Sequence, residues 1–314
     1  MRTDFYYDSC GAGRIHGCRW TPEGEIRGVF QIVHGIAEHV ERYDDFASYL
    51  NDRGILVVAE DHMGHGKSID NGGTPGYFDG GWEAAVQDSY ALLKATREEF
   101  PEKPYVLFGH SMGSFLVRSL LIIHPDSGIS GAIICGTGWQ PAAVLAGGEM
   151  TASAIAAAIG ERNPSEKLQN IVFGGYNNRV EHQRTPFDWL SRDSREVDRY
   201  IADPMCGFVA SAGLLRDMLG GMRMNQEKKN LQRMQKDLPV FFVAGGDDPV
   251  GSYGEGVRRT EEHFREAGME DVTCRIFPLC RHEILNEINK VEIYGTLYDL
   301  IVEKIPGMKG LNPA

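Results

Sequence analysis

The stretch LFGHSMGSF, residues 107–115, places a serine between two glycines where two apolar runs meet. A short apolar run before Gly109 is typical of a buried strand, and the longer run after Gly113 has the length of a helix. G-x-S-x-G between a strand and a helix is typical of a nucleophile elbow, in which the glycines leave room for neighbouring backbone and Ser111 projects above the sheet. A match of five residues also arises by chance, and a serine that only caps the helix is the alternative. The rest of the chain has to decide between them.

The length and composition indicate a folded protein without a nucleic-acid partner. The chain has 314 residues, of which 42% are hydrophobic and 24% charged, and its formal net charge is −12. That length is enough for one large domain with an insertion or for two small domains. No run of basic residues offsets the acidic balance, and nucleic-acid binding requires clustered Lys and Arg.

Neither a membrane anchor nor a disulfide framework is expected. The N-terminal stretch has no apolar region typical of a secretory signal. The most apolar long window, Pro141–Gly160, is interrupted by Glu149, and we interpret it as too weakly hydrophobic for a transmembrane segment. The six cysteines form no C-x-x-C pair, so we interpret them as reduced thiols and not as a zinc site. A cytoplasmic protein is therefore expected.

Short β-branched runs alternate with helical patterns along most of the chain. Strands are predicted over residues 26–35, 55–61, 105–111, 131–137, 239–248 and 272–279, and helices over 42–54, 82–100, 112–124, 254–267 and 286–304. Continuous apolar strands that alternate with helices indicate a mostly parallel sheet with both faces covered. Residues 4–20 are expected to add antiparallel edge strands.

The alternation stops after Gly138 and resumes near Asp237. The intervening stretch is helix-like, and we interpret it as an insertion on the carboxyl side of the sheet, where open α/β sheets bind ligands. The prediction is an α/β core formed by residues 1–140 and 238–314, with a helical cap or lid formed by residues 141–237.

A serine hydroxyl needs a base, and the base needs an orienting acid. In a fold of this type the chain order is Ser, then Asp or Glu, then His. His282 follows the last predicted strand, whereas His263 lies on a charged helix and is expected at the surface. The strand in the segment 239–248 ends at Gly245–Gly246, Asp247 and Asp248 come directly after it, and Pro249 restricts the backbone of Asp248. Asp248 is therefore the predicted acid, with Asp247 as the second choice, and His282 is the predicted base.

An oxyanion hole needs two backbone N–H groups, one from the residue after the nucleophile and one from the loop after the first long strand. Met112 and Ile36 occupy these positions, and Gly35 lets the loop turn closely. The histidines at positions 34, 39, 62 and 65 are interpreted as loop residues with local hydrogen bonds. The glycines of residues 60–68 do not have the spacing of a phosphate-binding loop.

With these pieces in order, the chain resembles the α/β-hydrolase superfamily, and within it the monoacylglycerol lipase and lysophospholipase group with its serine aminopeptidase-like hydrolases. The resembling motifs are HGIAEHVERY (34–43), EDHMGHGKS (60–68), GHSMG (109–113), GGDDPVG (245–251) and RHEILNE (281–287). The resemblance covers about residues 25–300. One departure is Ala37, where lipases of this group often have glycine.

Carried over position by position, the resemblance implies Ser111 as nucleophile, Asp248 as acid and His282 as base. It implies the N–H groups of Ile36 and Met112 as oxyanion donors. We expect a serine hydrolase that cleaves carboxylic esters, most specifically a monoacylglycerol or lysophospholipid, through an acyl-enzyme and without a metal or cofactor. Transient contact of the cap with a membrane or micelle surface is open to such an enzyme.

Two other functions stay open. An aminopeptidase, or an esterase for short or aromatic acids, is compatible with the same fold. A peptidase would hold its substrate amine with acidic groups of the cap, for which Glu149, Glu161 and Glu166 are available. A non-catalytic binding protein on this fold is the third option, and the complete set of three triad residues speaks against it.

Overall fold

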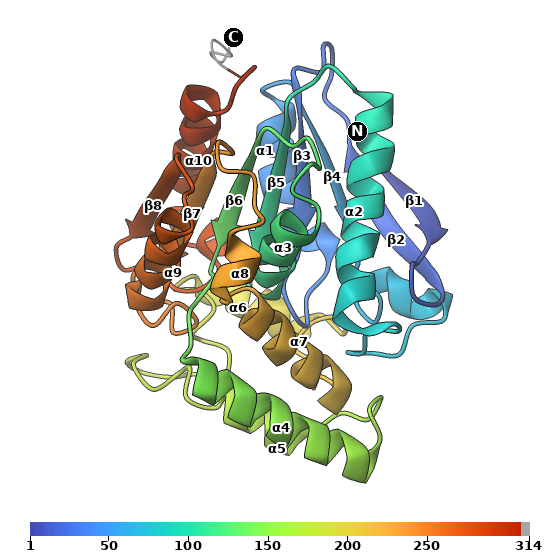
Figure 1. The fold of residues 1–314 in the computed structure, drawn as a ribbon, viewed down its shortest axis with the longest axis vertical. Coiled ribbons are helices and arrows are strands. Elements are labelled where there is room, and N and C mark those ends of the chain that lie inside the picture. Colours follow the sequence, from blue (N-terminus) through green and yellow to red (C-terminus); the bar gives the residue numbers. More distant parts are fainter. Residues whose placement is uncertain (309–314) are drawn as a thin grey trace.

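The computed structural model describes residues 1–308, and they contain an eight-stranded sheet in the order β1-β2-β4-β3-β5-β6-β7-β8 (Figure 1). The strands are β1 (Arg2–Asp8), β2 (Arg14–Trp20), β3 (Gly28–Val33), β4 (Ile55–Glu60), β5 (Tyr105–His110), β6 (Gly131–Cys135), β7 (Val240–Gly245) and β8 (Val272–Phe277). The β1–β2 and β2–β4 pairs are antiparallel, and the remaining pairs are parallel. The predicted mostly parallel sheet with antiparallel edge strands is therefore confirmed.

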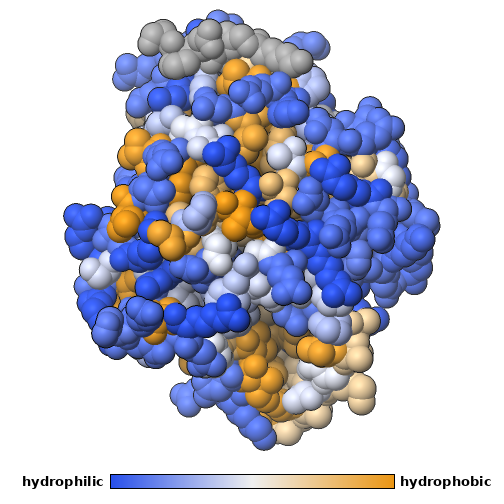
Figure 2. Space-filling view, turned by 90° about the vertical axis from the view of Figure 1, so that its left-hand side faces the viewer, coloured by the Kyte–Doolittle hydropathy of each residue, from blue (hydrophilic) through white to orange (hydrophobic). Residues whose placement is uncertain are grey.

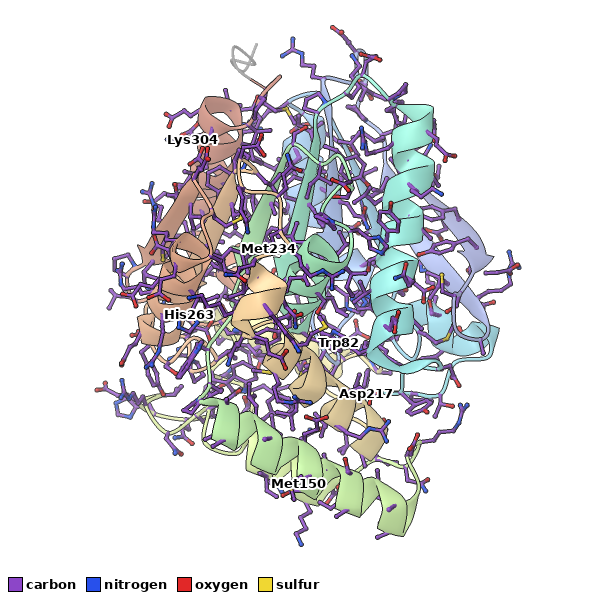
Figure 3. The ribbon with its side chains drawn as sticks, viewed as in Figure 1. Trp82, Met150, Asp217, Met234, His263 and Lys304 are labelled. Atoms are coloured by element: carbon purple, nitrogen blue, oxygen red, sulfur yellow. The ribbon has the colours of Figure 1, made fainter. Side chains whose placement is uncertain are left out.

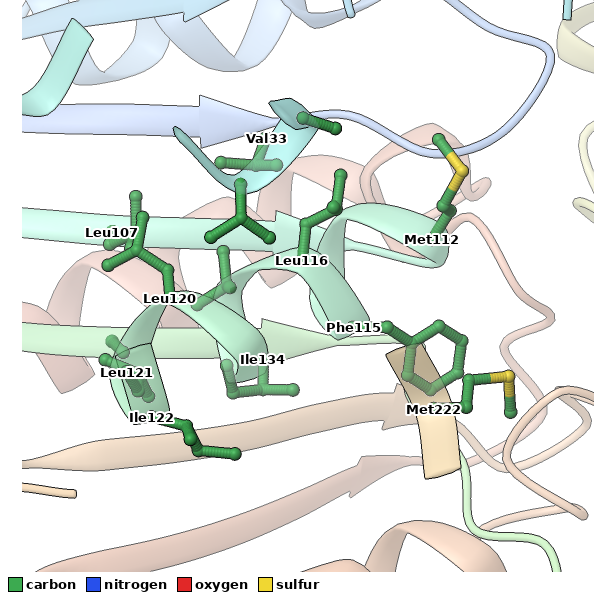
Figure 4. Packing of buried hydrophobic residues seen from close by; sticks show 14 of the residues in the cluster. Val33, Leu107, Met112, Phe115, Leu116, Leu120, Leu121, Ile122, Ile134 and Met222 are labelled. Carbon is green, nitrogen blue, oxygen red and sulfur yellow. The ribbon is translucent and has the colours of Figure 1, made fainter. Parts of the chain in front are cut away.

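Helices cover both faces of the sheet, which explains why the strands read as continuous apolar runs. One face carries α1 (Asp44–Asn51) and α10 (Lys290–Lys304), and the other carries α2 (Gly81–Glu99), α3 (Met112–Ile123) and α9 (Glu255–Glu266). Figure 4 shows Leu116 and Leu120 of α3 over Leu107 of β5 and Ile134 of β6. This packing fixes the start of α3 at the carboxyl end of β5.

Between β6 and β7 the chain leaves the sheet and forms a set of helices beyond the carboxyl ends of the strands (Figure 1). These are α4 (Ala142–Ile159), α5 (Glu166–Phe173), α6 (Ser194–Ala202), α7 (Ala212–Met224) and α8 (Lys228–Leu231). Three of them begin at a side chain that accepts a backbone N–H bond, the usual N-cap arrangement: Ser165, Asp193 and Ser211. We call residues 141–237 the insertion.

Helix α4 is the outermost helix of the insertion and lies along α7 (Figure 1). By length and composition it could cross a membrane, because its 18 residues have a mean hydropathy of 1.5, and only 17% of them are buried. The expectation that this stretch is too weakly apolar for a span is wrong on that criterion. One such helix is weak evidence of a span, since helices of soluble proteins pass the same test. Figure 2 shows apolar surface at this end of the molecule, and Met150, labelled in Figure 3, is 74% exposed.

The element boundaries differ from the predicted ones where local turns interrupt a helical pattern. The helix expected over residues 42–54 is preceded by a 3-10 turn, Val40–Tyr43, and α1 ends at Asn51. The C-terminal helix begins at Lys290, after a separate 3-10 turn, Ile284–Asn286. The backbone just before that turn is held by the insertion, because the Glu283 N–H donates to the Leu190 carbonyl oxygen at 2.7 Å.

Candidate active site

Ser111 lies between the last residue of β5 and the first residue of α3, in a backbone conformation with φ 54° and ψ −120°. A positive φ is rare for a residue with a Cβ, and such strain costs on the order of 1–3 kcal/mol, which the surroundings must offset. The Ser111 N–H donates to the Cys135 carbonyl oxygen of β6 at 3.0 Å, so the neighbouring strand holds the turn. This geometry lifts the Ser111 side chain out of the sheet and explains why the turn is sharp.

The glycines around Ser111 are required by close backbone approach. A Cβ on Gly113 would lie well inside van der Waals contact with the carbonyl oxygens of Val33 and His34. A Cβ on Gly109 would collide in the same way with the Gly113 carbonyl oxygen. The first turn of α3 therefore rests directly on the end of β3, which brings the Met112 backbone close to the loop that follows β3.

That loop carries the two other residues expected near the oxyanion. A Cβ on Gly35 would lie 3.0 Å from the Ser111 Cβ, so the loop backbone passes next to the serine. Ile36 follows it and lines the same cavity as Ser111 and Met112. Ala37, the departure from the lipase pattern, has φ 54°, which is the left-handed region that favours glycine. Alanine at this position therefore adopts a backbone conformation that is less favourable for it than for glycine. The Ala37 carbonyl oxygen accepts a hydrogen bond from Tyr200 Oη at 2.9 Å.

His282 and Asp248 are brought together at the carboxyl end of the sheet. Their Nδ1 and Oδ1 atoms are 3.0 Å apart, and both residues are buried. The Val250 N–H donates to the same Asp248 oxygen at 2.9 Å. Asp247, the second choice for the acid, is exposed to solvent. With Nδ1 engaged by Asp248, the other ring nitrogen is the one that can accept a proton.

That nitrogen, His282 Nε2, is buried and has no hydrogen-bond partner within residues 1–308. His282 and Ser111 line one cavity of about 820 Å³. Trp189 of the insertion packs against the imidazole, with ring centroids 5.0 Å apart. A buried nitrogen without a partner normally requires an explanation. A proton donor that enters the cavity would supply the missing partner.

Behind the site lies a buried charged network that our sequence-based reasoning did not identify. Arg42 bonds both carboxylate oxygens of Glu283 at 2.6 Å each and Glu38 Oε2 at 2.8 Å. Glu38 Oε1 accepts the Gly35 N–H at 2.6 Å and lies 3.1 Å from His110 Nδ1. The network thus joins the loop after β3, the residue before Ser111 and the residue after His282. The motifs over 34–43, 109–113 and 281–287 contain these residues, but no spacing in the sequence pairs them.

The charge states in this network follow from its contacts. Although burial favours the neutral acid, the His110 hydrogen bond and the Arg42 charge hold the pKa of Glu38 well below its usual value. Burial likewise opposes ionisation of Glu283, and Arg42 still lowers its pKa. Burial disfavours a charged His110, but its bond to Glu38 raises its pKa. The network therefore holds ionised carboxylates around one guanidinium.

The four loop histidines were expected to form local hydrogen bonds, and the structure shows such bonds for some of them but not for all. His34 Nδ1 is 2.7 Å from the Gly35 carbonyl oxygen and His65 Nδ1 is 3.3 Å from the Met63 carbonyl oxygen, so these bonds are local as expected. The rings of His62 and His34 are in tilted contact, with centroids 4.1 Å apart. His39 differs, because its Nε2 lies 2.8 Å from Asp203 Oδ2 in the insertion. Burial lowers the pKa of His62 to about 4 and that of His65 to about 3.

The cavity is bounded largely by the insertion. Its apolar wall includes Leu145, Met218, Leu219 and Met222 together with Phe115 of α3, which Figure 4 shows beside Met222. Its polar lining includes Glu38 and Glu283 and residues with side-chain amides, at Gln140, Gln169, Asn170, Asn177, Asn178 and Gln183. Among the described residues that line the cavity, none is Lys or Arg. The cavity therefore combines an apolar region with amide and carboxylate groups.

Comparison with known proteins agrees with this geometry. A family model described as serine aminopeptidase S33 matches residues 24–289. The monoacylglycerol lipase of Mycolicibacterium smegmatis is 29% identical over 91% of this chain and 92% of its own length. The monoglyceride lipase of Rattus norvegicus is 31% identical over 75% of this chain and 70% of its own length. A thermostable carboxyl esterase from Bacillus coagulans, solved with glycerol, has a TM-score of 0.88 at 28% identity, over 96% of this chain and 97% of its own. The resemblance in the motifs is thus confirmed, and the chain belongs to the serine aminopeptidase S33 family of the α/β-hydrolase fold.

Proposed function

We propose that this protein is a carboxylic ester hydrolase whose substrate is a monoacylglycerol. The observation that carries the proposal is the pairing of His282 with Asp248, which leaves the unpartnered Nε2 in the cavity that Ser111 also lines. Ser111 sits in the strained turn of a nucleophile elbow. The similarity to monoacylglycerol and monoglyceride lipases supports the substrate class.

The reaction follows from these positions. His282 Nε2 takes the proton of the Ser111 hydroxyl while Oγ attacks the ester carbonyl, and Asp248 stabilises the imidazolium that forms. The backbone N–H groups of Ile36 and Met112 stabilise the oxyanion. His282 then gives the proton to the departing glycerol oxygen, which leaves an acyl-enzyme. Water, deprotonated by the same nitrogen, attacks the acyl group and releases the fatty acid and Ser111.

We further propose that the insertion is a cap, residues 141–237, on a core formed by residues 1–140 and 238–314. The apolar wall of the cavity suits an acyl chain, and the amide side chains suit the hydroxyl groups of glycerol. A volume of about 820 Å³ lies in the upper part of the roughly 300–1,000 Å³ range of ligand pockets and favours a long acyl chain over a short one.

The exposed apolar residues of α4, among them Val144 and Met150, suit transient contact with a membrane or micelle surface. The free state of all six cysteines supports a cytoplasmic location.

Two features of the cavity separate this proposal from its rivals. A lysophospholipid carries a phosphate, and the cavity lining described above contains no Lys or Arg to pair with it. An aminopeptidase needs a free carboxylate for the substrate amine. Glu149 is paired with Arg223 and Glu161 with Arg216, and neither they nor Glu166 lines the cavity. Glu38 and Glu283 do line it, but both carboxylates are already paired with Arg42.

The test compares purified protein with its Ser111→Ala variant on a long-chain monoacylglycerol, the matching lysophospholipid and an aminoacyl-naphthylamide. We expect turnover of the monoacylglycerol alone at an appreciable rate, and loss of that turnover in the variant with an unchanged circular dichroism spectrum. Undiminished hydrolysis by Ser111→Ala would refute the nucleophile. Preference for the lysophospholipid or the naphthylamide would refute the substrate assignment while leaving the nucleophile in place.

A further inference from the structure

Three side chains with different donor atoms meet on one face of the β1–β2 hairpin, which forms an edge of the sheet (Figure 1). Asp4 of β1 is directly opposite Cys18 of β2 in the antiparallel register, and His16 lies two residues from Cys18. Residues two apart on a strand point to the same face. The register alone therefore gathers a carboxylate, a thiol and an imidazole. The sequence contains no C-x-x-C or other familiar metal-ligand spacing, because one of the three groups comes from the neighbouring strand.

The separations of the three donor atoms are within about half an ångström of the edges of a zinc tetrahedron. Cys18 Sγ is 3.3 Å from Asp4 Oδ1 and 4.0 Å from His16 Nε2, and His16 Nε2 is 3.7 Å from Asp4 Oδ1. Zinc bonds of about 2.0–2.3 Å in tetrahedral geometry place such donors roughly 3.3–3.6 Å apart. Shifts of a few tenths of an ångström would therefore bring all three atoms to bonding distance from one ion.

The imidazole is held in the orientation that metal ligation requires. His16 Nδ1 lies 2.7 Å from Asp61 Oδ2, and both residues are buried. A carboxylate that accepts one ring N–H leaves the other nitrogen with its lone pair free, and metal-binding histidines usually have such a partner. Asp61 itself is fixed, because it accepts the N–H groups of Val40 and Lys67 at 2.9 Å each. The hydrogen bond to Asp61 gives a structural role to Nδ1 alone. The other ring nitrogen, Nε2, remains directed at Asp4 and Cys18.

Access and charge are also suitable. His16 and Cys18 are fully buried, but the Asp4 side chain is 40% exposed, so an ion can enter from solvent and keep a water as its fourth ligand. Lys67 Nζ lies 3.7 Å from Asp4 Oδ2, the oxygen that does not face His16, and it is bonded to Glu41 at 2.9 Å. The ammonium thus has its own partner when Asp4 Oδ1 is engaged.

We propose that Asp4, His16 and Cys18 form a zinc site that clamps the edge strand β1 to β2. A thiolate, an imidazole and a carboxylate together favour Zn²⁺ over the harder Mg²⁺ and Ca²⁺. On binding, the Cys18 thiol loses its proton to solvent, Zn²⁺ forms bonds to Sγ, Nε2 and Oδ1, and the ion exchanges waters for these three ligands. Because one proton is released, binding weakens as the pH falls.

The experiment titrates Co²⁺ and then Zn²⁺ into reduced, metal-free protein that carries Cys10→Ser, which removes the exposed thiol. We expect one equivalent of Co²⁺ to give sulfur-to-cobalt charge-transfer absorption, which Zn²⁺ then abolishes, and we expect Zn²⁺ to raise the Tm. Cys18→Ser should eliminate the absorption. Asp4→Asn should weaken zinc binding by at least the roughly 10–100-fold that loss of an outer-shell partner costs. Asp4 is partly exposed, so that variant keeps the test valid if Cys18→Ser does not fold.

Cys206→Ser is the matched control, because His39, Asp203 and Cys206 form a second group of potential ligands at the edge of the insertion. Charge-transfer absorption that survives in Cys206→Ser and disappears in Cys18→Ser supports the proposal. Absorption that disappears in Cys206→Ser and survives in Cys18→Ser would move the site to the second group. Absence of thiolate absorption in the parent protein, or unchanged zinc affinity in Asp4→Asn, would overturn the proposal outright.

Discussion

Asp247 and Asp248 are neighbours in the chain but have opposite surroundings. Asp248 is buried and bonded to His282, whereas Asp247 is exposed. An amide at position 248 would present the wrong group to the imidazole Nδ1 and favour the wrong tautomer. We expect Asp248→Asn to lower kcat by about 10⁴-fold, the scale seen for the equivalent change in a serine protease triad. Asp247→Asn should leave kcat within a few-fold. The comparison needs only steady-state kinetics on one ester, and the opposite ranking would reassign the acid.

Arg42 presents a different problem at the residue scale, because it is buried between two carboxylates. Removing it leaves Glu38 and Glu283 without their counter-charge, and an uncompensated buried charge costs roughly 3–5 kcal/mol. Arg42→Met should therefore lower the free energy of unfolding by that amount and lower kcat as well, since the network holds Gly35 and the residue after His282. Urea unfolding measures the first effect.

The control is Arg19→Met, which breaks the more exposed ion pair with Glu99. Such surface pairs contribute about 0–1 kcal/mol. Equal destabilisation by the two variants would show that the buried network contributes no more than a surface pair.

At the scale of elements, two helical glycines differ in what surrounds them. A Cβ on Gly113 of α3 would collide with the end of β3, whereas a Cβ on Gly147 of α4 meets nothing within 4 Å. Alanine favours a helix by about 0.5–1 kcal/mol over glycine. We expect Gly147→Ala to raise the free energy of unfolding by up to that amount. Gly113→Ala should lower both stability and kcat, because α3 must move away from β3 and carry the Met112 N–H with it. A Gly113→Ala variant as stable and active as the parent would show that the contact is not tight.

The strands and helices of the core were well predicted from the sequence, whereas the contacts between them were not. The strands and the helices of the core follow from runs of apolar residues and from Gly and Pro at their ends, which are local properties. The stretch over residues 185–208 contains only one helix, α6, because much of it is loop that binds other parts of the chain. Asn177, for example, accepts the Trp189 N–H and donates to the Thr185 carbonyl oxygen. Such bonds depend on how loops meet in space and have no periodic signal.

For the whole molecule, buried titratable groups make stability depend on pH. Burial, together with the nearby Asp88, raises the pKa of Glu60 from 4.5 to about 8. Below pH 4.5 Glu60 is neutral in both states, and as the pH rises towards 8 only the unfolded state releases the proton. Stability from this group is therefore lost with increasing pH, by up to about 1.4 kcal/mol per pH unit.

In the unfolded state His62 and His65 lose their protons near pH 6.5, but they do so alike in the parent protein and in a Glu60 variant, so the difference between the two stability profiles isolates the Glu60 effect. We expect the free energy of unfolding to fall between pH 6.5 and 8 in the parent protein and to fall less in Glu60→Gln, which stays neutral throughout. Denaturant unfolding at several pH values measures both slopes, and the exposed Glu262→Gln serves as control. Parallel profiles for parent and Glu60→Gln would contradict a neutral Glu60 in the folded state.

The α/β fold was predictable from the residues alone, and the same reasoning proposes where the insertion lies and which three residues form the triad. These depend on hydrophobic period and on the fact that parallel strands end at one edge of the sheet, so that side chains placed just after strands converge there. Which distant groups meet became visible only in the folded molecule. Arg42 and Glu283 are 241 residues apart, His39 reaches Asp203 in the insertion, and Asp4 meets Cys18 across a strand pair. Side-chain contacts of this kind are set by packing in three dimensions, and the order of residues along the chain does not indicate them.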